Sequence, residues 1–396
     1  MQIINFLTHE TETIELLKSE IQNFLNQDTL IINDTRWMII PSVLPFIEFV
    51  WGYDQRVLSI LQNTNVIFSK PFSKEIETYY NSFWLAKDVN LMLIENKKEI
   101  TLAKNISQNE IFRQEIKAKK FKKIVPFFVN EDMDELSQIL EIPLSVSKEV
   151  FTKANDKLLL KKFLQVSNLP TIEWVFTSDR EVLQEYFSKK ERFLFKDPLW
   201  VSWYGFWDNS ENSLEELLEN YGEKELIIEK FIQKESSPSV QFFISEDKKS
   251  GIIFWITDQI LENGKVYLGN KSPSIYVGNS IWEKLVAQSE KIIEYIAKIW
   301  YTGFWGIDFI VDINGEIYAT EVNARFTWAT YPAVTSLLIK STLFASWDFY
   351  NYEWEKENIK DYLEKKSILN KDEIWIFPLG ISGLETFWKA NILKFN

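Results

Sequence analysis

An acidic chain of 396 residues with a net charge of −13 is too long for one typical hydrophobic core and lacks the basic face that broad nucleic-acid binding needs. Its 46% hydrophobic and 26% charged residues are typical of a globular protein. The absence of cysteine excludes disulfides and thiolate metal sites. We find neither a signal peptide nor an apolar stretch long enough to span a bilayer, and therefore expect a cytoplasmic protein without membrane or nucleic-acid partners.

The first third of the chain alternates between helical and strand patterns. Residues 11–26 space their apolar side chains as an amphipathic helix does. Three short apolar runs, TLIIND, NVIFSK and LMLIEN, predict buried strands with helical stretches between them. This alternation predicts a small α/β domain over residues 1–145. The single histidine, His9, has no visible metal-binding or nucleophilic partner, and we assign it no chemical role.

A second unit begins near residue 146. Residues 147–170 predict one helix that ends at Asn168 and Pro170. The acidic tail from residue 346 predicts further helices. Between these segments the patterns predict a strand at 192–198, a helix at 213–221, strands at 224–232, 239–245 and 250–261, a helix at 281–299, and strands at 305–313 and 316–324.

The most informative stretch reads GIDFIVDINGEIYATEVNARFTWATYP and starts at residue 306. Its two strand patterns are joined by Asn314-Gly315, a dipeptide that favours tight hairpin turns. Asp308 lies on the first strand, and Glu321 and Asn323 lie on the second. Because residues two apart on a strand point to the same face, we expect three oxygen donors to converge from paired strands.

Such a set of oxygen donors suits Mg²⁺, which also keeps phosphate oxygens in its coordination shell. Arg325 extends the same face, and its forked guanidinium can bind a phosphate or a carboxylate. The alternative is a half-exposed sheet edge with scattered polar groups. The regular alternation favours a binding site, because apolar side chains occupy the opposite face at Val322, Ala324 and Phe326.

The stretch GIDFIVDINGEIYATEVNARFT resembles the metal-binding end of the ATP-grasp superfamily, in which an acidic residue on one strand precedes Glu-x-Asn-x-Arg on the next. The resemblance extends over roughly residues 146–340. It implies a mixed α+β and α/β chain, with an ATP-grasp fold of two α+β subdomains gripping ATP, preceded by a small α/β pre-grasp domain. We accordingly expect a pre-grasp-like domain at 1–145, an ATP-grasp domain at 146–345 with a lid at about 171–228 and a hinge at 229–232, and a C-terminal segment at 346–396.

The resemblance also implies roles for individual residues. Asp156-Lys157 opens a helix where the family has its first nucleotide lysine, Lys196 precedes the flexible loop as the second lysine does, and IIEKFI resembles the adenine hinge. Arg325 and Lys196 would act in catalysis by stabilising the transferring phosphate. The implied metal ligands for Mg²⁺ or Mn²⁺ are Asp308, Glu321 and Asn323. The implied ATP-binding residues are Lys157, Lys196, Trp203, Tyr204, Gly205, Glu229, Lys230, Phe231, Ile232 and Glu235.

These assignments compete with structural interpretations. Lys157 belongs to a charged helix that also carries Lys153, Lys161 and Lys162, a pattern typical of a solvent-exposed face. Glu229 could cap a strand, and the ribose-binding role of Glu235 rests on the ambiguous stretch QKESSPS. Lys196 is more unusual, because an unpaired lysine on an apolar strand is costly to bury.

Tryptophan occurs where a phosphate-binding loop needs glycine. In KDPLWVSWYGFWDNS, residues 196–210, Trp200, Trp203 and Trp207 stand at positions where any Cβ would hinder the approach of phosphates to the backbone. Glycine averages about 7% of residues, so this chain should hold about 28 glycines; it holds 12, together with 16 tryptophans. The chain is also rich in residues that AT-rich genes encode.

We therefore hypothesise that many tryptophan letters are UGA codons that the native cell reads as glycine. Glycine would also fit the family pattern at Trp255, Trp300 and Trp328. The alternative is a genuinely aromatic protein, in which indoles fill the phosphate lid.

The reaction that the resemblance implies is that of an ATP-dependent carboxylate–amine (or thiol) ligase. A substrate carboxylate attacks the γ-phosphorus of ATP, and an amine captures the acylphosphate with release of ADP and phosphate. The N-terminal half resembles, more weakly, that of peptide-ligase-like members, which implies small-molecule carboxylate and amine substrates such as amino acids or peptides. Selectivity would lie in the N-terminal domain and around residues 258–274. Superfamily members are often dimers, which leaves a homodimer open.

Three other functions compete with this one. The first is a nucleotide-binding pseudoenzyme or a non-catalytic binding module, particularly if Trp200, Trp203 and Trp207 are genuine. The second is a phosphotransferase, which would consume ATP without an amine. The third is a biotin-dependent carboxylase, which is disfavoured because no bicarbonate motif is visible.

Overall fold

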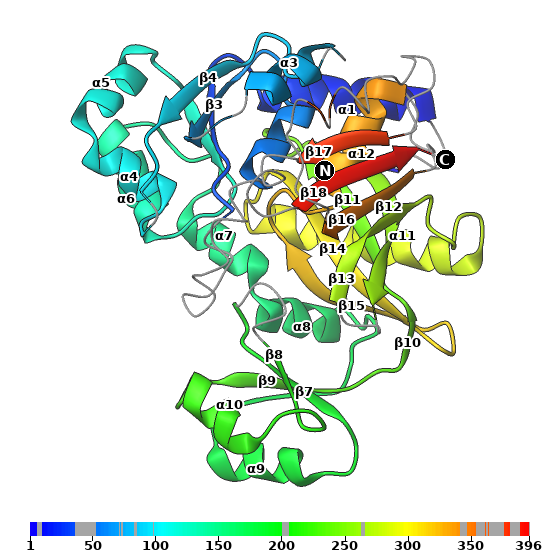
Figure 1. The fold of residues 1–396 in the computed structure, drawn as a ribbon. Helices are drawn as coiled ribbons and strands as arrows, with labels where there is room; N and C mark the ends of the chain where they lie inside the picture. The colour runs from blue at the N-terminus through cyan, green and yellow to red at the C-terminus, as the bar shows by residue number, and fades with distance from the viewer. Residues whose placement is uncertain are drawn as a thin grey trace.

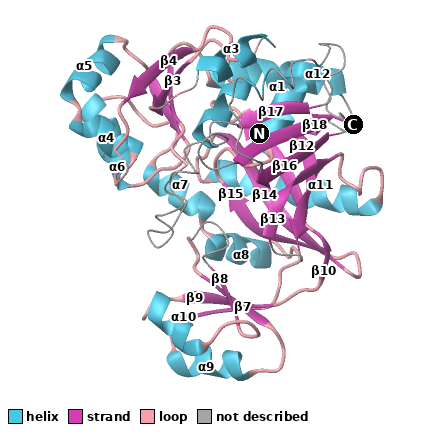
Figure 2. Cartoon of the chain, viewed as in Figure 1, coloured by secondary structure: helices cyan, strands magenta, loops and turns pink. Residues whose placement is uncertain are grey.

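In the computed structural model, the described part of the chain forms three β-sheets with flanking helices (Figures 1 and 2). His9 lies outside the residues that the structure describes, as do Trp200, Trp203, Tyr204 and Gly205. Within the described part of the chain, no helix combines the length and apolar character needed to cross a membrane. The structure describes residues 1–5, 10–35, 53–70, 72, 74–82, 85–97, 99–199, 206–262, 266–340, 347–353, 361, 363, 376–380 and 389–395.

A parallel sheet with strand order β4-β3-β2-β5 forms the N-terminal α/β unit. Strand β2 is buried along its whole length, as expected for a parallel strand covered on both faces. The predicted helix at 11–26 and the three predicted strands are confirmed. The elements are α1 (Glu10–Phe24), β2 (Thr29–Ile32), η3 (Gln55–Ile60), β3 (Asn65–Ser69), α3 (Lys74–Ser82), β4 (Asn90–Ile94), α4 (Leu102–Gln108), α5 (Glu110–Ala118), β5 (Lys123–Pro126) and α6 (Glu131–Leu140).

The central element is a ten-stranded sheet with the path β10-β14-β11-β12-β13-β16-β18-β17. Strand β1 pairs in parallel with β12, and β15 pairs with β14. Helices α11 and α12 pack against this sheet (Figure 1). The elements are β1 (Gln2–Asn5), β10 (Lys234–Ser236), β11 (Pro238–Ile244), β12 (Ser250–Glu262), β13 (Val266–Ser272), α11 (Ser280–Lys298), β14 (Gly303–Asp312), β15 (Ile317–Asn323), α12 (Thr330–Lys340), β16 (Trp347–Glu353), β17 (Ile376–Gly380) and β18 (Lys389–Phe395).

A separate sheet with strand order β6-β9-β7-β8 projects from the lower part of the molecule in Figure 1. Its own small core includes Leu183, Phe195, Leu217 and Ile228. Three sheets of mixed α/β content, one of them a small projecting unit, confirm the expected fold class. The elements are β6 (Trp174–Thr177), α9 (Arg180–Ser188), β7 (Phe193–Lys196), β8 (Phe206–Asp208), α10 (Leu214–Tyr221) and β9 (Leu226–Lys230).

The single helix predicted at 147–170 is wrong in one respect, because two helices meet at Asp156. Helix α7 (Lys148–Asn155) ends there, and α8 (Lys157–Val166) begins there. The Asp156 side chain accepts hydrogen bonds from the backbone N–H groups of Leu158 and Leu159, at 2.8 and 3.1 Å. A short acidic side chain that satisfies the first N–H groups of a helix is a strong N-cap, and it starts a new helix here.

The helical tail predicted from residue 346 is wrong at residues 347–353, 376–380 and 389–395, which are strands, whereas the described residues Asp361 and Leu363 are helical. Strands β16, β17 and β18 pair in antiparallel fashion and extend the ten-stranded sheet. Trp347 and Phe349 are two apart and fully buried, the period of a strand rather than of a helix. The predicted boundaries at 145/146 and 345/346 stay predictions, since β1 and the three tail strands join the sheet that carries β14 and β15.

Candidate active site

The predicted hairpin of β14 and β15 brings the expected oxygen donors together. Its register places Asp308 opposite Glu321, and Gly306 opposite Asn323. The turn contains Gly315 at φ +75°, where glycine is favoured. A shift in register follows Asp308, so this carboxylate lies where the regular ladder is interrupted.

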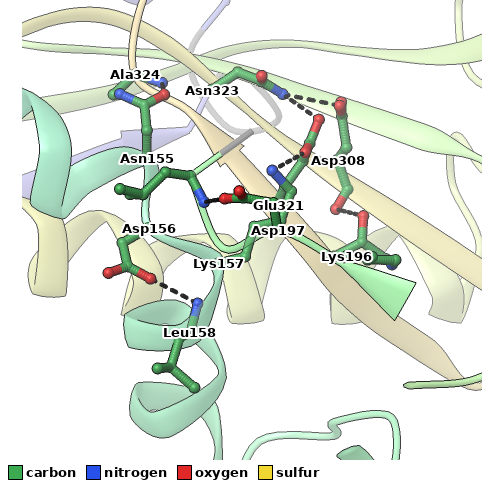
Figure 3. Close-up of polar contacts among 12 residues, drawn as sticks. Asn155, Asp156, Lys157, Leu158, Lys196, Asp197, Asp308, Glu321, Asn323 and Ala324 are labelled. Atoms are coloured by element: carbon green, nitrogen blue, oxygen red, sulfur yellow. Dashed lines mark hydrogen bonds and ion pairs between the residues drawn. The ribbon is translucent and has the colours of Figure 1, made fainter. Parts of the chain in front are cut away.

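Asn323 links the two carboxylates of this hairpin. Its Nδ2 donates to Asp308 Oδ2 at 2.9 Å and to Glu321 Oε1 at 3.2 Å (Figure 3). The Ser239 hydroxyl donates to the other Asp308 oxygen at 2.7 Å. Burial, together with the neighbouring charge of Glu321, raises the pKa of Asp308 to about 7. Two half-buried carboxylates at opposite positions of the hairpin repel one another, which makes the site one where a cation is favourable.

Lys157 and Arg325 supply positive charge around Glu321 and Asn323. Lys157 Nζ lies 3.1 Å from Glu321 Oε2 (Figure 3). Arg325 is buried, and its Nη2 donates to Asn323 Oδ1 at 2.5 Å. Lys157 is the first residue of α8, directly after its N-cap Asp156. At this helix start its side chain reaches Glu321 of the hairpin. Lys157 and Arg325 therefore lie beside the predicted metal ligands.

Asn155 holds Arg325 in place, and the sequence analysis missed it. Its Oδ1 accepts from Arg325 Nη1 and from the backbone N–H of Ala324, both at 3.0 Å. Asn155 is buried at the end of α7. The sequence around Asn155 carries no signal for this contact, because its partner Arg325 lies 170 residues further along the chain.

A buried cluster of two lysines and one glutamate lies between α8 and the small sheet. Glu229 on β9 is 1% exposed and forms ion pairs with Lys161 and Lys196. Lys161 is only 2% exposed, so its interpretation as part of a solvent-exposed face is wrong. It lies four residues after Lys157, hence on the same helix face, which is the signal that was available. Lys196, the unusual lysine of β7, has its counter-charge in Glu229.

Burial lowers the pKa of both lysines, to about 6 for Lys161 and about 8 for Lys196. A neighbouring lysine adds to the effect in each case, Lys196 for Lys161 and Lys157 for Lys196. When both lysines are protonated, one shared carboxylate compensates only one of the two positive charges. An anion bound next to Lys196, which is the more exposed of the two lysines at 16%, would therefore favour the protonated form of both.

The segment expected to be the hinge connects the small sheet with the central sheet. Lys230 ends β9 and is exposed, and β10 begins at Lys234. The backbone N–H of Phe231 donates to Arg192 O at 2.8 Å, and the Arg192 guanidinium lies 3.9 Å from the centre of the Phe231 ring. Ile232 is half-buried. Glu235 is exposed on β10, and its ribose-binding role stays a prediction, as do the roles of the hinge residues.

Three of the expected nucleotide-binding residues, Trp203, Tyr204 and Gly205, lie outside the described residues. Trp207 of the same loop lies on β8, opposite Phe195 of β7. Its ring contacts that of Tyr221 edge to face, with centroids 6.4 Å apart. Trp207 is thus packed against the small core next to the strand that carries Lys196.

The candidate metal site has two carboxylates and one amide. In the described parts of the chain, histidine, cysteine, aspartate and glutamate form no group of three or more that could hold a metal ion. Mg²⁺ commonly binds few protein oxygens and keeps water or substrate phosphate oxygens in its other positions. Asp308, Glu321 and Asn323 fit that pattern, and their placement supports the metal-ligand prediction without testing it.

Comparison with known proteins identifies the family of the central region. A family model described as the ATP-grasp domain matches residues 154–329, which include both lysine positions and the hairpin. A curated relative, the [Butirosin acyl-carrier protein]–L-glutamate ligase of Niallia circulans, is 28% identical over 231 residues. The match covers 52% of this chain and 52% of that ligase, so the chain spans about half the length of the curated relative that it matches.

Solved structures share the fold over nearly the whole chain. The ADP complex of an N5-carboxyaminoimidazole ribonucleotide synthetase has a TM-score of 0.60 at 14% identity, covering 94% of this chain and 93% of the other. Biotin carboxylase from Campylobacter jejuni has a TM-score of 0.59 at 13% identity, covering 94% and 88%. At these identities the likeness establishes the fold, and the expected ATP-grasp architecture with an N-terminal domain is confirmed.

Proposed function

The chain carries an ATP-grasp domain at residues 154–329, and from this premise we propose that it is an ATP-dependent carboxylate–amine ligase that releases ADP and phosphate. The observation that supports the proposal most directly is the hairpin site. There Asp308, Glu321 and Asn323 meet, with Lys157 on one side and Arg325 on the other. Positive charge and oxygen ligands around one point suit a nucleotide phosphate with its metal ion.

In this proposal the residues of the chain bind and orient ATP and neutralise its charge. Lys157 and Lys196 bind phosphate oxygens, and Asp308, Glu321 and Asn323 hold Mg²⁺ or Mn²⁺. A bound Mg²⁺ would neutralise charge on the phosphates. Arg325 is held by Asn155 and Asn323, so its guanidinium is positioned before the reaction and loses no orientational freedom during it.

The reaction proceeds in two steps that balance. A substrate carboxylate oxygen attacks the γ-phosphorus, the bond to the β-phosphate bridging oxygen breaks, and ADP leaves. The amine nitrogen then attacks the acyl carbon, phosphate leaves, and the amine loses its proton to solvent. Closure of the small sheet over the site would keep water from the acylphosphate. The Niallia circulans relative is an L-glutamate ligase. We propose that this chain also uses an amino acid as a substrate, with L-glutamate as the first candidate.

We further propose that the native chain has glycine at several tryptophan positions, as UGA recoding would produce. Trp300 supports this, because it has φ +76° directly after α11, a backbone conformation that glycine adopts most easily at helix ends. Trp305 lies only 3.4 Å, centroid to centroid, from the Phe242 ring, closer than the 4.5–7 Å that aromatic pairs prefer. Trp255 argues against glycine at its own position, because its buried indole N–H donates to the Ser272 hydroxyl at 2.8 Å.

The codons behind Trp200, Trp203, Trp207 and Trp328 test the recoding directly, and UGG codons would contradict it. The functional test uses the full chain with glycine at these four positions. We expect ADP formation that requires both an added carboxylate and an added amine, and about 10²–10³-fold slower turnover in Arg325→Met. The matched control, Arg113→Met on α5, should turn over normally. ADP formation without an amine would indicate a phosphotransferase instead.

A nucleotide-binding pseudoenzyme is the second candidate, and the indole of Trp207 beside the Lys196 strand favours it if the tryptophans are genuine. Equal ATP affinity for the tryptophan and glycine forms, measured by calorimetry, would contradict our view that indoles block the lid. A cytoplasmic location and a homodimer stay predictions.

A further inference from the structure

Arg56 is a buried cation on which the charge of Asp54 acts without a direct ion pair. It lies on η3 in the N-terminal unit and is 1% exposed. Its Nε donates to the Tyr53 carbonyl at 3.1 Å, whereas its buried Nη1 has no hydrogen-bond partner. Among the residues that the structure describes, no carboxylate forms an ion pair with it. This sets Arg56 apart from Lys157, Lys161 and Lys196, each of which contacts a glutamate.

Three aromatic rings surround the guanidinium. Its central carbon lies 3.7 Å from the centre of the Trp328 ring, 4.4 Å from Tyr53 and 5.2 Å from Tyr331. Cation–π contacts of this kind are worth about 0.5–2 kcal/mol each, less than the cost of burying an unpaired charge. The nearby Asp54 carboxylate accepts from the backbone N–H and the hydroxyl of Thr35. The charge of Asp54 acts on Arg56 without a direct ion pair, so the rings and Asp54 together compensate the buried guanidinium only in part.

Of the three rings, Trp328 is the one that covers Arg56 from the side of the solvent. Tyr53 and Tyr331 are buried, whereas Trp328 is only half-buried. The Trp328 ring also contacts Tyr53 and Tyr267, with centroids 4.7 and 6.1 Å away. Glycine at position 328 would remove this cover and leave a space lined by Arg56 and tyrosine rings.

The space at Trp328 is connected with the candidate active site by a chain of hydrogen bonds. Gln241 Oε1 accepts from the Thr327 hydroxyl at 2.6 Å, and Gln241 Nε2 donates to Ser239 Oγ at 3.0 Å. Ser239 in turn donates to Asp308, so the residue before Trp328 is tied to the hairpin carboxylate through two side chains. The charges of both Asp308 and Arg56 act on the pKa of Tyr267, whose ring contacts that of Trp328.

We propose that Arg56 binds a carboxylate of the amino-acid substrate, in a subsite that the side chain at position 328 closes. This subsite is additional to the reacting group that would be activated at the hairpin. A carboxylate would supply the missing counter-charge, and its two oxygens match the forked guanidinium. The inference rests on the proposed function for the identity of the substrate, whereas the anion subsite itself follows from the geometry around Arg56.

The test measures L-glutamate binding by calorimetry on the full chain, with and without MgADP. Trp328→Gly should bind L-glutamate at least about tenfold more tightly than the parent or than Trp328→Phe, which keeps an aromatic ring in place. In the Trp328→Gly background, Arg56→Met should weaken binding about 10- to 100-fold, the range for a hydrogen-bonded charge. Arg56→Lys should bind with an intermediate affinity, and Arg113→Met should match its parent.

The carboxylate that Arg56 recognises is identified with two analogues. L-glutamine lacks the side-chain carboxylate and L-isoglutamine lacks the α-carboxylate, so one of them should lose affinity only when Arg56 is present. Thermal unfolding of each variant separates loss of the fold from loss of the subsite. A folded Arg56→Met that binds L-glutamate as tightly as Arg56 overturns the inference, and so does a Trp328→Gly form that binds none. Glutamate binding that depends on Arg56 in a chain that does not bind MgADP would support the subsite and refute the ligase.

Discussion

Two groups of buried or half-buried cations differ in how their charge is compensated. Around the hairpin and the small sheet, Lys157 faces Glu321, while Lys161 and Lys196 share Glu229. In the N-terminal unit, Arg56 faces aromatic rings. The first arrangement gives each lysine a glutamate partner within the chain, so these side chains are ordered before a ligand binds. The second leaves a guanidinium with an unsatisfied Nη1 and no direct ion pair among the described residues, which a bound carboxylate could supply.

The difference also separates positioning from recognition. A phosphate site benefits from fixed cations, because groups that are already oriented pay no reorganisation cost when charge develops. A substrate subsite gains selectivity from an unpaired buried group, because a ligand that lacks the matching charge leaves that group unpaired. Three experiments test this distinction between paired and unpaired cations and the strain at one exposed tryptophan. They remove one carboxylate, titrate one lysine over a pH series, and relax the backbone of one strained residue.

Removing the shared carboxylate should have the largest effect. Glu229→Gln leaves Lys161 and Lys196 buried without a counter-charge, and we expect a loss of about 3 kcal/mol in the free energy of unfolding. Both lysines have pKa values below that of an unfolded lysine, so the unfolded chain binds more protons and stability rises with pH. The loss should therefore shrink between pH 6 and 10.

Urea unfolding at several pH values measures this prediction. The control is Glu95→Gln, whose carboxylate is 79% exposed and pairs with Lys70 on the surface; it should change stability by about 0.5 kcal/mol or less. If Glu229→Gln lowers the free energy of unfolding no more than this control, the Glu229 ion pairs contribute no more to stability than a surface ion pair, which contradicts the prediction.

Titration of Lys196 should have an intermediate effect. Because its pKa is lowered to about 8, the ammonium loses its proton just above neutral pH. We expect MgADP affinity, measured in the glycine form, to fall about tenfold between pH 7 and pH 9. Lys196→Arg should bind MgADP with little change over this range, since an arginine stays charged.

The same pH series sharpens the comparison with Arg56. L-glutamate binding to the Trp328→Gly form should stay constant where MgADP binding weakens, because the guanidinium of Arg56 keeps its proton. If the affinities for MgADP and L-glutamate fall in parallel, the two sites do not titrate independently. One titrating group would then control both affinities.

The hairpin was predictable from the sequence because its geometry is local. The Asn314-Gly315 turn and a period of two fix which side chains of β14 and β15 share a face, so the sequence alone groups Asp308, Glu321 and Asn323. The ATP-grasp resemblance rests on the same local pattern. Lys157 could be named only through that resemblance, in which the first nucleotide lysine stands at the start of a helix.

Contacts between distant segments were not predictable. The burial of Lys161 depends on Glu229 of β9, and nothing in the charged helix indicates that partner. The role of Asn155 depends on Arg325, and the cage of Arg56 combines η3 with the segment after β15. The tail was predicted as helix from its acidic composition, whereas pairing with β13 decides that β16 is a strand.

Relaxing Trp300 should have the smallest effect and the opposite sign. Trp300 is 72% exposed and has φ +76°, a conformation that costs a residue with a Cβ roughly 1–2 kcal/mol. Its visible compensation is a contact of the Lys248 ammonium 3.3 Å from its ring, worth about 0.5–1 kcal/mol at an exposed site. Trp300→Gly should therefore raise the free energy of unfolding by up to about 1 kcal/mol, whereas Trp300→Ala, which keeps a Cβ and loses the ring, should not.

Trp282→Gly is the matched control on the buried face of α11, and there the same exchange should destabilise the chain by removing core packing. A destabilising Trp300→Gly would show that the indole contributes more through its contacts than its backbone conformation costs, and would remove the structural support for glycine at this position.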